Sequence, residues 1–404
     1  MDQRQSHRTA LSVLALCFSL SVFGRGLGES FTVFLLPVSN SFGWDRASVV
    51  SIYSLSALCG GLAAPIVGRM FDAFGPRAVY SLGLAMLGLA FLGASIAQQL
   101  WQFQALVGLG VGFAIAAIGN VPNSILLGRW FGPRLPTAMA IVYSATGAGI
   151  LLMLPVAQLL IEQFGWQGAY QCFGWAALAV CIPLGVMRWS GIAQGSPHVA
   201  QVTAAEPGER NWTLRSAVRH HAFWSLFATF FFTAIGMYAI SAQVVAYLVD
   251  AGFPPLQAAS AWGFSGVALI VGMLSISWLD SVIGRRRSVL LSYAFSIVGI
   301  VLLWMLKRYP NIWLLTGFVI TFGSMVGSRG PLITATAMKI FRGDQVGTIY
   351  GTIAIGSGLG AAFGAWFGGL LHDLTGSYDP LLAFALISVV IGALPFLTVR
   401  ALRE

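Results

Sequence analysis

The feature that most constrains the fold of this chain is a series of long, continuous apolar segments. Apolar residues make up 57% of its 404 residues and charged residues only 9%, whereas a soluble domain carries roughly a quarter charged residues. A helix needs about 20 residues to cross a bilayer, and lipid offers no partner for backbone hydrogen bonds, so we expect each segment to be a transmembrane helix. The strands of a membrane β-barrel would alternate in polarity, and these segments do not. The chain is therefore predicted to be an all-α multi-pass membrane protein.

Twelve such segments can be placed along the chain. They lie at about residues 10–36, 47–68, 78–98, 101–128, 136–162, 167–188, 222–249, 256–279, 287–306, 311–339, 345–371 and 380–400. Most Lys and Arg residues fall at the two ends and in every second connecting segment, whereas Arg46, Lys307 and Arg308 fall in the others. Positive charge gathers on the cytoplasmic side, so we expect both termini there, in a bacterial-type inner membrane. The net charge of +9 then reports topology rather than nucleic-acid binding.

An internal repeat divides the chain into two halves. Sliding the sequence over itself by 209 residues aligns Gly75 with Gly284, Arg77 with Arg286, Pro122 with Pro331 and Gly147 with Gly356. A single offset that holds across five helices without a gap indicates duplication, and many transporters are built from such repeats. We expect two pseudosymmetric six-helix bundles, residues 1–189 and 222–404, joined by a cytoplasmic linker at residues 190–221.

The loop between the second and third segments resembles the signature loop of the major facilitator superfamily. It reads Gly68-Arg-Met-Phe-Asp72-Ala-Phe-Gly75-Pro-Arg77. The second half carries a degraded copy, in which the offset puts Ser277 and Ser281 where Gly68 and Asp72 stand, with Asp280 next door. The resemblance implies the major facilitator fold. We expect gating roles for Gly68, Asp72, Gly75 and Arg77, and for Asp280 and Arg286 in the second half.

Three further stretches are similar to the monocarboxylate-porter and oxalate/formate-antiporter branches of that superfamily. They are Phe42-Gly-Trp-Asp-Arg-Ala-Ser, Phe164-Gly-Trp-Gln-Gly-Ala-Tyr and Gly376-Ser-Tyr. The resemblance implies that spans 1, 4, 7 and 10 line a central cavity. The chain departs from these branches at two positions. They usually carry a substrate arginine in span 8, whereas span 8 of this chain, residues 256–279, has no charged residue. In span 4, Gln104 stands where an arginine is common.

Three charges lie deep inside predicted spans. At 1.5 Å per residue, Arg25 lies roughly 22 Å from the inner end of span 1, and Arg329 roughly 26 Å from the outer end of span 10. Charges at such depth are costly and mark pathways or binding sites. An Arg fork matches a carboxylate, so we predict that Arg25 and Arg329 bind a small anion. Glu29, four residues from Arg25 on one helix face, is the predicted proton carrier. The alternatives are an ion pair that only braces span 1, and snorkelling for Arg329.

The repeat adds neutral polar residues to this predicted site. The offset maps Asn120 onto Arg329 and Glu29 onto Tyr238. Asn123 and Ser241 lie on or near the same faces. Ordinary helix–helix hydrogen bonding is the alternative for Asn120, Tyr238 and Ser241.

These features predict a secondary transporter that moves a small organic anion, a mono- or dicarboxylate in our hypothesis, by alternating access with proton coupling. One alternative is efflux of an amphipathic or cationic compound recognised by Glu29, and a less favoured one is a transporter-like sensor. The sequence contains no catalytic constellation, no nucleotide-binding loop and no metal-ligand spacing among its four cysteines. We therefore expect no enzymatic activity, cofactor or metal, and a protein that functions as a monomer in the lipid bilayer.

Overall fold

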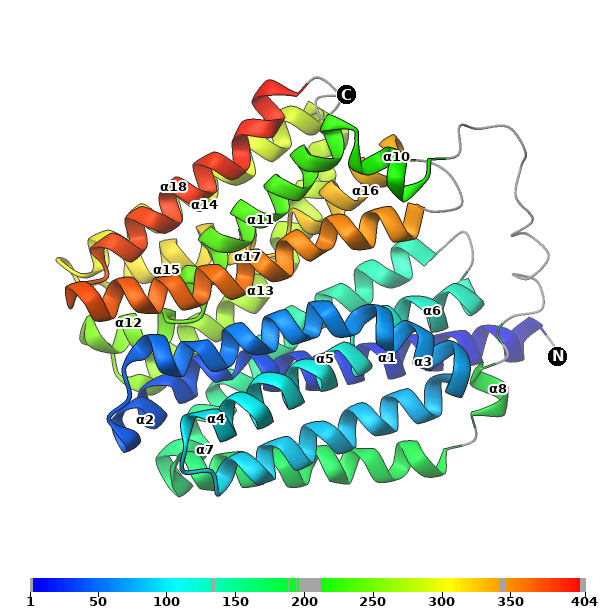
Figure 1. The fold of residues 1–404 in the computed structure, drawn as a ribbon, viewed down its shortest axis with the longest axis horizontal. Helices are drawn as coiled ribbons and strands as arrows, with labels where there is room; N and C mark the ends of the chain where they lie inside the picture. The colour runs from blue at the N-terminus through cyan, green and yellow to red at the C-terminus, as the bar shows by residue number, and fades with distance from the viewer. Residues whose placement is uncertain are drawn as a thin grey trace. The chain divides into compact units, whose positions relative to one another are not determined.

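The structure is a computed structural model that describes residues 3–131, 135–187, 189–193, 195, 212–341 and 346–399. Within this part the chain forms helices joined by short turns (Figure 1), and no strand is found there. Contacts divide the chain into two compact units. Unit 1 comprises Met1–Phe31 and Leu62–Pro207, and unit 2 comprises Thr32–Gly61 and Gly208–Glu404.

Unit 1 contains the first helix and most of the helices up to the linker. They are α1 (Gln3–Glu29), the second part of α3 (Arg46–Ser95), α4 (Leu100–Phe103), the π-helix η1 (Gln104–Val111), α5 (Gly112–Ile118), α6 (Asn120–Phe131), α7 (Leu135–Val186) and α8 (Ser190–Ala193). α1 packs along α7 through two glycines, because a Cβ on Gly26 would lie only 2.8 Å from the Gly149 carbonyl oxygen. Small residues let membrane helices approach this closely.

Unit 2 contains the remaining helices. They are α2 (Phe31–Phe42), the first part of α3, α10 (Leu214–Val218), α11 (His221–Ser241), α12 (Val244–Asp250), α13 (Pro255–Ile283), α14 (Arg285–Leu306), α15 (Ile312–Thr321), the 3₁₀ turn η3 (Gly323–Met325), α16 (Gly330–Ile340), α17 (Val346–Thr375) and α18 (Asp379–Thr398). α11 packs against both α17 and α18 (Figure 1).

The predicted number of membrane crossings agrees with these helices. Nine helical stretches in the described residues are long and apolar enough to span a membrane. Two of them, Arg46–Ser95 and Thr137–Val186, are 50 residues long and are interrupted by non-helical backbone at Gly75 and Gly165. Each therefore supplies two crossings. The apolar stretch Ile312–Met325, continued by α16, supplies the tenth span and completes twelve.

The repeat predicted from the sequence is visible in the backbone. Gly75 and Gly284 have φ values of 77° and 82°, and Gly43 and Gly252, also 209 residues apart, have φ values of 66° and 98°. Positive φ is favourable for glycine alone among common residues. Each of these four glycines lies in a turn between successive spans, so the two halves reverse direction with the same local geometry.

The boundaries of the units differ from those of the predicted six-helix bundles. Residues 32–61, expected in the first bundle, pack within unit 2: a Cβ on Gly369 of α17 would lie 3.0 Å from the Ala47 Cα. The linker at 190–221 lies mostly outside the described residues. Its described part includes α10, which Thr213 caps by accepting a hydrogen bond from the Ser216 N–H at 3.3 Å. The division at residues 189 and 222 stays a prediction.

Candidate functional site

Four spans contain a break in their helix. α1 gives way to α2 at Ser30, and in unit 1 α5 gives way to α6 at Gly119, whose φ and ψ are −98° and −148°. In unit 2, α11 and α12 are separated by Ala242 and Gln243, and α15 and α16 by the segment 322–329. The 209-residue offset pairs Gly119 with Ser328, which lies inside this last interruption. These are spans 1, 4, 7 and 10, and the polar residues predicted for the site lie next to the interruptions.

Arg25 and Glu29 form the predicted pair at the end of α1. Arg25 Nη2 lies 3.8 Å from Glu29 Oε1, and both side chains are partly exposed. The span continues as α2 after Ser30, whose hydroxyl donates to the Leu27 carbonyl at 2.6 Å. A contact of 3.8 Å is a loose ion pair without the short N–H···O geometry of a strong one.

Asn120 and Asn123 lie on the first turn of α6 and differ in environment. Asn120 is exposed. Asn123 is fully buried, accepts a hydrogen bond from Tyr80 Oη at 2.7 Å and donates to Ser21 Oγ at 2.8 Å. These bonds connect α6 to α3 and α1, so Asn123 braces unit 1. Contact of either asparagine with a substrate stays a prediction.

The interruption of span 7 contains a buried amide that the sequence analysis did not select. Gln243 is 1% exposed, and neither its Nε2 nor its Oε1 has a hydrogen-bond partner among the described residues. The buried hydroxyl of Ser241 likewise has none there. Tyr238 is half-buried, with its ring 6.2 Å from that of Tyr53. An amide within an otherwise apolar span was the signal that could have identified Gln243, because buried polar groups normally have partners.

Arg329 is held by α14 and is 3% exposed. Its Nε donates to Ser292 Oγ at 2.8 Å, and its Nη2 donates to the Ser292 carbonyl at 2.7 Å and to Ser296 Oγ. The guanidinium carbon lies 4.1 Å from the centre of the Tyr293 ring, a cation–π contact. Nη1 has no hydrogen-bond partner among the described residues. Two of the three guanidinium nitrogens are thus engaged by the protein, and binding of an anion by the third stays a prediction.

A second charged network joins α3, α12 and α17 within unit 2. Arg46 Nη2 lies 2.6 Å from Asp250 Oδ2, and Arg46 Nη1 also donates to Tyr378 Oη. Both carboxylate oxygens of Asp373 accept backbone N–H groups at the start of α3, from Arg46 at 3.1 Å and from Ala47 at 2.6 Å. Arg46 and Tyr378 come from two of the stretches quoted above for the family resemblance, so these stretches, distant in the sequence, are in contact.

The predicted gating residues divide into two groups. In the first half, Asp72 and Arg77 are exposed and have no ion-pair partner in the described part of the chain, and a Cβ on Gly68 would lie 3.7 Å from Val121 Cγ1 of α6. In the second half, Asp280 Oδ2 lies 3.3 Å from Nη2 of Arg285, while Arg286 is exposed. Asp280 therefore pairs with Arg285, a residue that the sequence analysis did not select. The gating roles themselves stay predictions.

A helical membrane protein with a duplicated architecture, and with charged and amide side chains at interruptions of four spans, belongs to the class of secondary transporters. The family model of the Major Facilitator Superfamily matches the chain over residues 14–281 and 270–404. The chain belongs to the Major Facilitator Superfamily, and it is a multi-pass membrane transporter with the twelve-helix major facilitator fold.

Individual relatives agree with this assignment. The chain is 26% identical to the uncharacterized MFS-type transporter YcxA of Bacillus subtilis over 99% of this chain and 98% of that protein. It is also 26% identical to monocarboxylate transporter 12 of Rattus norvegicus, over 94% of this chain and 84% of that protein. The crystal structure of a bacterial homologue of the human lysosomal transporter Spinster matches with a TM-score of 0.68 and 14% identity, over 96% of this chain and 95% of that one.

Proposed function

We propose that this transporter moves a small organic anion, a mono- or dicarboxylate, by alternating access. The observation that carries the proposal is the environment of Arg329. Its buried guanidinium has only neutral partners among the described residues, namely two serines and a tyrosine ring. A buried cation is costly unless an anion compensates it, and a bound carboxylate would supply that charge.

The first unit supports the same choice of charge. Arg25 and Glu29 form an ion pair at 3.8 Å. Arg25 and Arg329 carry two positive charges and Glu29 one negative charge, so the net charge of these three residues is positive. An anion that reaches these side chains gains charge-assisted hydrogen bonds. A cationic substrate would instead meet a net repulsion. The names of the monocarboxylate transporters among the relatives are consistent with a carboxylate substrate.

Proton coupling is the second part of the proposal. Glu29 is one helical turn beyond Arg25 and lies next to the interruption at Ser30. When Glu29 is ionised it competes with the substrate for Arg25. When Glu29 takes up a proton, that competition ends and Arg25 can bind the anion. Substrate and proton would then cross together.

The experiment is counterflow and uptake of radiolabelled monocarboxylates and dicarboxylates, lactate and succinate first, in proteoliposomes. Arg329→Lys should lose most of the uptake, because an ammonium group cannot reproduce the planar donors that reach Ser292 and Ser296 and still present one to the substrate. The matched control is Arg308→Lys in an exposed turn, which should retain wild-type uptake. Wild-type uptake by Arg329→Lys, or transport of cationic dyes without competition by carboxylates, would refute the proposal.

A further inference from the structure

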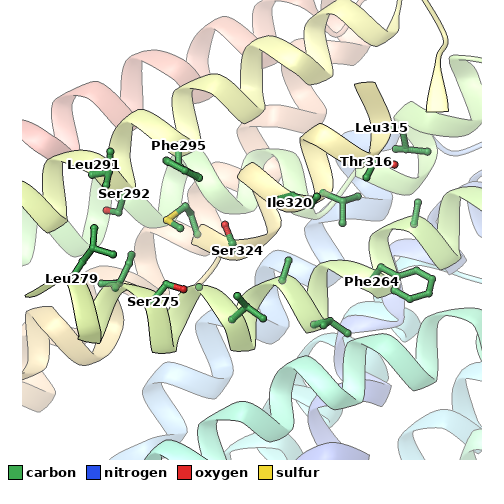
Figure 2. A pocket seen from close by; sticks show the side chains of 18 of the residues that line it. Phe264, Ser275, Leu279, Leu291, Ser292, Phe295, Leu315, Thr316, Ile320 and Ser324 are labelled. Atoms are coloured by element: carbon green, nitrogen blue, oxygen red, sulfur yellow. The ribbon is translucent and has the colours of Figure 1, made fainter. Parts of the chain in front are cut away.

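A large groove in unit 2 lies beside the proposed transport site and shares Ser292 with it, since Ser292 lines the groove and also accepts a hydrogen bond from Arg329 Nε. It has a volume of about 760 Å³ and lies between α13, α14 and the α15–η3 segment. Figure 2 shows its side chains projecting from these three elements. Along α13 the groove extends from Gln257 to Leu279, which at 1.5 Å per residue is about 33 Å. This length matches the hydrocarbon core of a bilayer, about 30 Å thick.

The walls of the groove are apolar and open to the outside of the unit. Phe264 and Val271 of α13, Leu291 and Phe295 of α14, and Ile320 of α15 all line it and are exposed. In a membrane protein such side chains meet lipid chains rather than water, so an alkyl chain is the occupant that their chemistry fits. An apolar groove as long as the bilayer core suits one extended acyl chain.

One end of the groove is cationic. α14 starts with Arg285, Arg286 and Arg287, and Leu279 and Ser288 line the groove at this end. Arg285 is engaged, since its Nη2 lies 3.3 Å from Asp280 Oδ2 and its Nη1 donates to Thr336 Oγ1 at 3.1 Å. Arg286 and Arg287 are both exposed.

Helical spacing distinguishes the two exposed arginines. Residues four apart lie on one face of a helix, so Arg287 continues the stripe formed by Leu291 and Phe295, both of which line the groove. Arg286 lies above Leu290, which does not belong to the groove. Only Arg287 therefore stands at the end of the exposed apolar stripe, where a lipid headgroup would be.

We propose that this groove is a binding site for an anionic phospholipid, with one acyl chain along α13 and α14 and the headgroup phosphate at Arg287. A basic residue at the membrane surface attracts anionic lipids, and an Arg guanidinium matches phosphate geometry.

The test is thermal unfolding of the purified, delipidated full-length protein with added palmitoyl-oleoyl phosphatidylglycerol or phosphatidylcholine. The anionic lipid should stabilise the wild type at an approximately fivefold lower concentration than the zwitterionic lipid, the factor expected for one Arg at the membrane surface. Arg287→Gln should remove this difference, whereas Arg286→Gln, which loses the same charge one residue away, should keep it. An equal loss in both variants would show general surface attraction and overturn the proposal.

A second pair of variants tests the acyl chain. Val271→Trp fills the groove from an exposed position and should abolish stabilisation by both lipids, while Ile387→Trp, at an exposed position of α18 outside the groove, should leave it intact. Unfolding temperatures without lipid establish that both variants fold. Unchanged lipid stabilisation in Val271→Trp would refute the acyl-chain site. Stabilisation of the wild type by glycerol phosphate alone, equal to that by the anionic lipid, would also refute the proposal, because it would show a site for a free anion.

Discussion

Replacing Gln243 by Met should make the substrate-free protein more stable while removing its ability to recognise substrate. The amide of Gln243 is 1% exposed at the interruption between α11 and α12, and neither of its polar atoms has a partner among the described residues. Met has a similar length and no strong hydrogen-bonding group, so it fills the same space without leaving a buried donor and acceptor unsatisfied. If the amide forms hydrogen bonds with the substrate, it is unpaired and destabilising in the substrate-free protein, and it is paired only when the substrate binds.

The size of the effect follows from the unpaired amide, counted as one polar group. A buried amide without a partner costs about 1–3 kcal/mol. Gln243→Met should therefore raise the free energy of unfolding by about 1–3 kcal/mol, reduced by any small repacking cost of the thioether. Stabilising changes that cost function are characteristic of binding sites.

The assay is thermal unfolding followed by tryptophan fluorescence, with and without a saturating transported carboxylate. The matched control is Gln158→Met: Gln158 is also buried, but its Nε2 donates to Glu162 Oε1 at 2.9 Å, so this variant should be destabilised. Wild-type protein should gain stability with the carboxylate and Gln243→Met should not. A fall in the unfolding temperature of Gln243→Met would show that the amide has a structural partner, and the reasoning would fail.

Further variants test the proposed proton coupling at Glu29 and the role of Asp373 at the start of α3. Glu29→Gln should abolish carboxylate accumulation driven by a proton gradient while exchange survives, because the side chain can no longer take up a proton. Normal pH-driven uptake by this variant would disprove the coupling role. Asp373→Ala should lower the free energy of unfolding by about 2 kcal/mol, since it leaves the Arg46 and Ala47 N–H groups at the start of α3 without their acceptor. Asp72→Ala, at an exposed position with no ion pair in the described residues, should change stability by less than about 0.5 kcal/mol, and an equal effect of both variants would contradict the capping role.

The sequence predicted the parts of the site that depend on spacing alone. Arg25 and Glu29 share a face because they are four residues apart on one helix, and the structure places them 3.8 Å apart. The pairing of Gly75 with Gly284 by the repeat also predicted equivalent turns, which the φ values confirm. The sequence did not select Arg285, which pairs with Asp280, because the offset maps Arg77 onto Arg286, and a difference of one residue rotates a side chain about 100° around the helix.

The sequence by itself determined that this chain spans a membrane, how many times it crosses, and where its deep charges lie along each span. These properties follow from local composition and from a repeat, since lipid forces each apolar segment to satisfy its own backbone. The tertiary structure alone decided what those charges touch. Ser292 and Ser296 engage two of the three guanidinium nitrogens of Arg329, Tyr80 and Ser21 engage Asn123, and the buried Gln243 amide has no partner among the described residues. Contacts between distant helices depend on which faces pack together, and no spacing along the chain records that.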